Sequence, residues 1–113
     1  MNNINSQAEI HCFKYNGDGT FLHTKHTAQK TLQNNFGNYL LPNGITVNYT
    51  DLGKLQNNIM YSLEYDIVDF LYSVIQQESD KLKNKNSLSN EEIVNCFNNI
   101  DKLTNAYLNN NIT

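Results

Sequence analysis

The chain has 113 residues, a formal net charge of −3 and a hydrophobic fraction of 39%. The length predicts one domain, and the hydrophobic fraction, with seven Tyr and five Phe, excludes wholesale disorder. Eight lysines against eleven acidic residues disfavour binding to duplex nucleic acid, because that binding depends on neutralising phosphates.

Neither a signal peptide nor an apolar run near the ~20 residues of a membrane span is visible, so we expect no membrane contact. Cys12 and Cys96 lie far apart in the sequence, and we expect them to be reduced thiols of a cytoplasmic protein. Asn occupies 21 positions and Arg none, which indicates an AT-rich genome, such as that of a low-GC bacterium, its phage or plasmid, or an AT-rich eukaryote.

Two β-hairpins are predicted in the first half, after a flexible N-terminus at residues 1–7. Two β-like segments, 8–15 and 20–27, flank the turn sequence Asn-Gly-Asp-Gly at positions 16–19. If Tyr15 pairs with Thr20, the register places Cys12 opposite His23 and Glu9 opposite His26.

The second hairpin is predicted from residue 38 to residue 49, around the turn Pro42-Asn43-Gly44. Between the two hairpins, Ala28, Leu32 and Phe36 have helical spacing, so a short helix is one interpretation of residues 28–36.

A long helix over residues 52–75, capped by Thr50 or Asp51, is the central expectation. Apolar residues recur there at spacings of three and four: Leu52, Leu55, Ile59, Leu63, Ile67, Phe70 and Val74. A second set with the same spacing lies roughly opposite the first on a helical wheel: Tyr61, Tyr65, Val68 and Tyr72. This Tyr set is either half-buried core or an exposed interface, and both interpretations stay open.

The last helix is predicted from a capping box at Ser89-Asn90-Glu91-Glu92. Its expected apolar face consists of Ile93, Phe97, Ile100, Leu103 and Tyr107. We expect this helix to fold back on the long one as an antiparallel pair. The predicted fold class is therefore α+β, a small antiparallel sheet of two hairpins packed against a helical hairpin, with the domain at 8–108 and a loose tail at 109–113.

Metal-ligand chemistry is confined to His11, Cys12, His23 and His26 in the first hairpin. A spacing of three puts His23 and His26 on opposite faces of a strand, and a zinc site needs three or four converging ligands. We therefore expect no metal and no cofactor, and no catalytic motif points to an enzyme.

The leading hypothesis is a non-enzymatic protein-interaction module, a homodimer that binds or sequesters a protein partner, as an inhibitor or adaptor of a mobile genetic element does. Its interface residues are Tyr61, Tyr65, Val68 and Tyr72. The alternative is a protein that binds a small ligand, a metabolite or nucleotide, in a pocket between sheet and helices or at a dimer seam. A third and weaker hypothesis is an enzyme or metalloprotein that uses the His and Cys residues.

Overall fold

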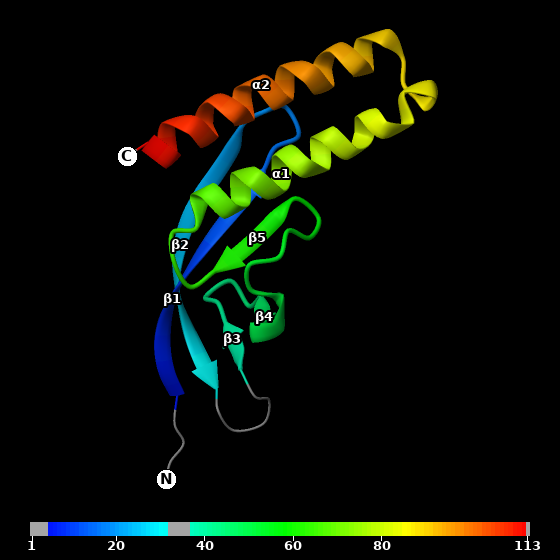
Figure 1. The fold of residues 1–113 in the computed structure, drawn as a ribbon. Coiled ribbons are helices and arrows are strands. Elements are labelled where there is room, and N and C mark those ends of the chain that lie inside the picture. The colour runs from blue at the N-terminus through cyan, green and yellow to red at the C-terminus, as the bar shows by residue number, and fades with distance from the viewer. Residues whose placement is uncertain (1–4, 32–36, 113) are drawn as a thin grey trace.

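A computed structural model of the chain describes residues 5–31 and 37–112. An antiparallel sheet occupies the N-terminal half and a helical pair follows it, so the predicted α+β class is confirmed (Figure 1). The strands are β1 (Asn5–Tyr15), β2 (Phe21–Thr31), β3 (Asn38–Leu40), β4 (Thr46–Asn48) and β5 (Ile59–Ser62). The helices are α1 (Ile67–Lys81) and α2 (Asn90–Ile112), joined by 3-10 turns at Leu82–Ser87. The strand order in the sheet is β4-β3-β2-β1-β5.

The first hairpin forms as predicted, but its register was wrong by one residue. Tyr15 pairs with Phe21 rather than Thr20, because Asn16 donates its N–H to the carbonyl of Thr20 and closes a five-residue loop. A shift of one residue moves one strand's side chains to the other face relative to its partner. Consequently Phe13 lies opposite His23, and the two faces differ from those expected from the sequence.

The second hairpin is confirmed, with Tyr39 opposite Val47 and both side chains buried. Its turn contains Pro42-Asn43-Gly44, and Leu41 donates its N–H to the carbonyl of Ile45. The short helix suggested for residues 28–36 is wrong at residues 28–31, which belong to β2. Residues 32–36 lie outside the described part of the chain.

The single long helix over residues 52–75 is wrong. Gly53, Asn57 and Asn58 have positive φ angles of 79°, 52° and 67°, which interrupt a helix. Residues 59–62 instead form β5, which pairs with β1, and α1 begins only at Ile67. The expected cap at Thr50 or Asp51 is also wrong, because Asn48 caps a 3-10 turn at Tyr49–Asp51.

The capping box at the start of α2 is confirmed. Glu92 donates its N–H to Ser89 Oγ at 3.1 Å, and Ser89 donates its N–H to Glu92 Oε1 at 2.8 Å. The helix runs antiparallel to α1, as expected, and continues to Ile112, beyond the domain boundary predicted at residue 108 (Figure 1).

Two apolar clusters lie on opposite faces of the sheet. The larger joins the sheet to the helices and includes Phe13, Tyr15, Phe70, Leu71 and Leu103. The smaller lies beneath the second hairpin and consists of Ile10, Ala28, Tyr39, Leu41 and Val47.

The molecule measures 60 × 34 × 19 Å, and its radius of gyration of 17.0 Å exceeds the ~13 Å expected for a compact chain of this length. This thin, elongated shape leaves the outer sides of the helices uncovered (Figure 1).

Candidate functional site

The four predicted interface residues do not share one helical stripe. Tyr61 lies in β5, Tyr65 lies in the loop before α1, and Val68 and Tyr72 lie on α1. Tyr61 is half-buried, pairs with Cys12 across the ladder and packs against the smaller cluster. Burial and the neighbouring Cys12 raise the pKa of Tyr61, so its hydroxyl stays neutral. Tyr61 is therefore partly buried in the sheet beside the smaller cluster and does not lie on the helix pair.

Tyr65 covers a pair of histidines on the helix-facing side of the sheet. Its ring lies edge-on to His23 with centroids 4.8 Å apart, and 5.8 Å from the ring of Phe13. His11 Nδ1 and His23 Nε2 are 2.9 Å apart, which is hydrogen-bond distance, and the two rings are nearly parallel. Burial, followed by the charges of His11 and Lys25, lowers the pKa of His23. The Tyr65 side chain is still 53% exposed, so one part of it packs on the histidines while another part contacts solvent.

The structure separates the other metal-ligand candidates from this histidine pair. Cys12 lies opposite Thr24 rather than His23, on the other face of the sheet, and His26 pairs with Ile10 on that same face. Cys96 lies on α2 against Glu78. Within residues 5–31 and 37–112, no three His, Cys, Asp or Glu side chains are placed to ligate one metal ion.

Val68 and Tyr72 lie on a side of the helix pair that we call the helical face, although Val68 and Ile75 also pack against the larger cluster. On α1, spacings of four, three and four place Val68, Tyr72, Ile75 and Ser79 on one side. That side lies opposite Phe70, which stacks on Phe13 of the sheet. On α2, the corresponding side carries Ile93, Phe97, Ile100, Thr104 and Leu108. Tyr72, Phe97 and Leu108 are 56%, 51% and 48% exposed, and the other six are half-buried.

None of the nine side chains of the helical face is charged. The face is two helices wide, about 20 Å, and about 25 Å long, so it offers about 500 Å² for contact. The sequence analysis predicted Val68 and Tyr72 as interface residues of one long helix, and both lie on α1 in the structure. It predicted Ile93, Phe97 and Ile100 as part of one apolar face of the last helix, which was expected to fold back on the long helix.

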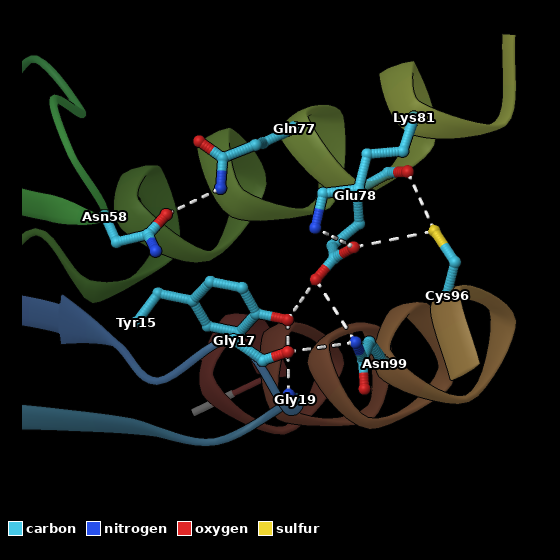
Figure 2. Close-up of polar contacts among 9 residues, drawn as sticks. All are labelled: Tyr15, Gly17, Gly19, Asn58, Gln77, Glu78, Lys81, Cys96 and Asn99. Atoms are coloured by element: carbon cyan, nitrogen blue, oxygen red, sulfur yellow. Dashed lines mark hydrogen bonds and ion pairs between the residues drawn. The ribbon is translucent and has the colours of Figure 1, made fainter. Parts of the chain in front are cut away.

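A buried carboxylate network ties the helices to the first hairpin (Figure 2). The Glu78 side chain is completely buried and accepts a hydrogen bond from the hydroxyl of Tyr15. Its other partners are Lys81 Nζ at 3.1 Å, Asn99 Nδ2 at 3.3 Å and Cys96 Sγ at 3.5 Å. The Tyr15 hydroxyl also accepts a hydrogen bond from the N–H of Gly19 in the hairpin loop. The network therefore joins β1, the β1–β2 loop, α1 and α2.

These contacts shift the pKa values of Glu78 and Cys96. Burial by itself would raise the pKa of Glu78, but hydrogen bonds from Tyr15 and Lys81 and the charge of Lys81 outweigh it and leave the pKa lowered. Burial and the Glu78 carboxylate raise the pKa of the Cys96 thiol, which is 4% exposed. A buried, protonated thiol is a poor nucleophile. The sequence signal for Glu78 was its place in the spacing Ile67, Leu71, Val74, Glu78 on the buried side of α1.

An open groove of about 530 Å³ runs between the loop at 53–55 and α1. Its lining combines apolar surface with the polar residues Lys54, Ser73, Gln76, Gln77 and Asp80, and Tyr72 lies at one side. The groove lies between a loop and one helix, whereas the small-ligand alternative expected a pocket between sheet and helices or at a dimer seam.

Comparisons of the chain with protein-family models, curated proteins and solved structures found no match. None of the helices in the described part of the chain is long and apolar enough to cross a membrane.

Proposed function

We propose that this protein is a non-enzymatic protein-interaction module that forms a homodimer through the helical face and binds or sequesters a protein partner. The observation that carries the proposal is the uncharged outer surface of the helix pair, where Tyr72, Phe97 and Leu108 remain about half exposed. Aromatic residues at the centre of an apolar patch are typical of interfaces, since they add large rigid contact area.

A second copy is a suitable occupant of this surface. In such a dimer the two helix pairs would pack against each other between the two sheets. Each exposed apolar side chain would then contact apolar side chains of the other copy. Burial of about 500 Å² on each copy gives a total of about 1,000 Å², at the lower limit for a specific interface. We therefore expect a dimer of moderate affinity whose mass depends on concentration in the micromolar range.

The test is solution mass by light scattering over a concentration series, comparing the wild type with Phe97→Glu. A charge placed at the centre of the contact must lose its hydration on association, so the variant should stay at the 13.0 kDa of one chain while the wild type approaches twice that mass. Leu22→Glu is the matched control, because Leu22 is 56% exposed on the sheet and lies outside the helical face.

Circular dichroism establishes that both variants remain folded. A wild type that stays monomeric at hundreds of micromolar contradicts the proposed dimer. Equal loss of mass in Phe97→Glu and Leu22→Glu would show that association does not depend on the helical face.

A further inference from the structure

Residues 5–10 of β1 form a long open stretch of sheet edge within the described part of the chain. β1 pairs with β2 along its whole length, but with β5 only from His11 to Lys14. The outer edge of β5 is already covered, because Gly53 donates its N–H to the carbonyl of Tyr61 and Gln56 exchanges hydrogen bonds with Ile59. On the other side of the sheet, β3 pairs only with residues 29–31 of β2, so residues 21–28 of β2 are open as well, but that stretch contains Lys25, and lysine disfavours edge pairing.

The backbone groups that point to this edge follow from the register. Tyr15 donates its N–H to the carbonyl of Asn58, so Tyr15 directs its backbone groups toward the β5 side. Backbone direction alternates along a strand, so Asn5, Gln7 and Glu9 direct their N–H and C=O groups to the same side. β5 ends at Ser62, opposite His11, and no strand of the described chain lies beside these three residues.

Residues 5–10 carry few of the features that prevent edge-to-edge pairing. Proteins protect open edges with Pro, Lys, bulges, very short strands or a covering loop. The sequence Asn-Ser-Gln-Ala-Glu-Ile contains no Pro, Gly or Lys, and its pairing with β2 is continuous. Such an edge is a template for an added strand.

We propose that the open edge of β1 binds an extended segment of the sequestered partner, added antiparallel to β1 in line with β5. This inference rests on the proposed function, which assigns the helical face to the second copy. Pairing copies through both surfaces would build higher-order rings or open filaments, whereas a foreign segment at the edge leaves a closed dimer intact.

The two faces of the edge specify the chemistry of the added strand. Ile10 is completely buried and Ala8 packs against the same smaller cluster, so side chains added on that face should be apolar. Glu9 lies on the other face with its side chain 55% exposed, 3.7 Å from Lys25 Nζ and 3.9 Å from His11 Nε2, so a neighbouring Lys or Arg in the added strand would share this carboxylate with Lys25. The partner segment therefore alternates apolar residues with polar ones and carries a basic residue beside Glu9.

Proline substitutions test the backbone groups that point to the open edge separately from those that bind β2. Gln7→Pro removes an N–H that points to the open edge, and its ring blocks an added strand while the bonds to β2 remain. Gln7→Ala changes the same side chain but keeps the N–H. Ala8→Pro is the reverse control, because the N–H of Ala8 points to β2, and its loss should destabilise the hairpin.

The probe is a synthetic library of eight-residue peptides that alternate Val or Ile with variable polar residues, incubated with immobilised protein. Wild type and Gln7→Ala should retain a subset enriched in Lys or Arg at one polar position, and Gln7→Pro should retain at least tenfold less. Hydrogen exchange on the wild type supplies a second measurement, because a bound peptide should protect the amides of Gln7 and Glu9.

Equal retention by Gln7→Pro and the wild type, or no peptide retained and no amide protected, would overturn the proposal. So would protection of these amides by self-association without peptide. If the peptide experiment fails, the result of the Phe97→Glu mass measurement is unaffected. If the proposed dimer does not form, that failure is seen in the mass measurement alone.

Discussion

Tyr15→Phe tests whether the Glu78 network holds the helix pair onto the first hairpin. The substitution keeps the ring in the larger apolar cluster and removes only the hydroxyl, which donates to the buried Glu78 carboxylate and accepts the N–H of Gly19. A hydrogen bond to a charged group contributes about 1.5–3 kcal/mol, and a buried amide left without a partner costs about 1–3 kcal/mol.

Solvent can reach the loop that contains Gly19 more readily than Glu78, so we take the lower part of the second range. The expected loss of unfolding free energy is then about 3 kcal/mol, which corresponds to about 10 °C in Tm for a domain of this size. Urea denaturation followed by circular dichroism at pH 7 measures it. Tyr72→Phe is the matched control at an exposed hydroxyl and should change the free energy by less than about 0.5 kcal/mol.

The pH dependence provides an independent check of the same network. Because the pKa of Glu78 is lowered in the folded state, its contribution is fully present above the pKa of an unfolded Glu, about 4.3, and is lost as the pH falls through the folded value. The difference between wild type and Tyr15→Phe should therefore shrink in acid. If Tyr15→Phe matches Tyr72→Phe at neutral pH, the hydrogen bond to Glu78 adds no net stability and the reasoning is refuted.

Two further predictions concern the histidine pair and the second helix. The pKa of His23 is lowered in the folded state, so the unfolded chain binds more protons there, and stability should fall as the pH drops below about 6.5. His23→Gln should flatten that part of a stability profile measured by urea titration, and an unchanged slope would contradict the assignment to His23. Ser89→Ala removes the side-chain half of the capping box and should cost about 1 kcal/mol, whereas Ser87→Ala, outside α2, should cost less. Equal losses in the two variants, measured by thermal unfolding, would show that the capping box does not stabilise α2.

Local sequence signals predicted the elements that depend on a few neighbouring residues. The turn glycines at positions 17 and 19, the Pro-Asn-Gly turn and the capping box at Ser89 each specify backbone geometry by their own chemistry. They were enough to predict both hairpins, the start of α2 and the α+β class.

Tertiary structure decided the features that depend on contacts between distant segments. Apolar spacing from Leu52 to Ile75 fits a helix, but Gly53, Asn57 and Asn58 turn the chain so that Ile59–Ser62 can pair with β1. Strand pairing with a segment some fifty residues away leaves no local periodic signal, so the sequence pattern could not distinguish β5 from a helix.

The candidate surfaces were likewise predicted in part from the sequence and decided in part by the tertiary structure. The sequence alone determined that Val68 and Tyr72 share one side of a helix, since spacing fixes direction on a helix. Only the packing of α2 beside α1 shows that Phe97 joins that face while Leu103 is buried. Likewise, the open edge of β1 exists because β5 ends at Ser62, and the burial of Glu78 exists because the hairpin loop closes over α2. Each of these depends on how far separated segments meet, which is a property of the folded chain rather than of any local stretch of residues.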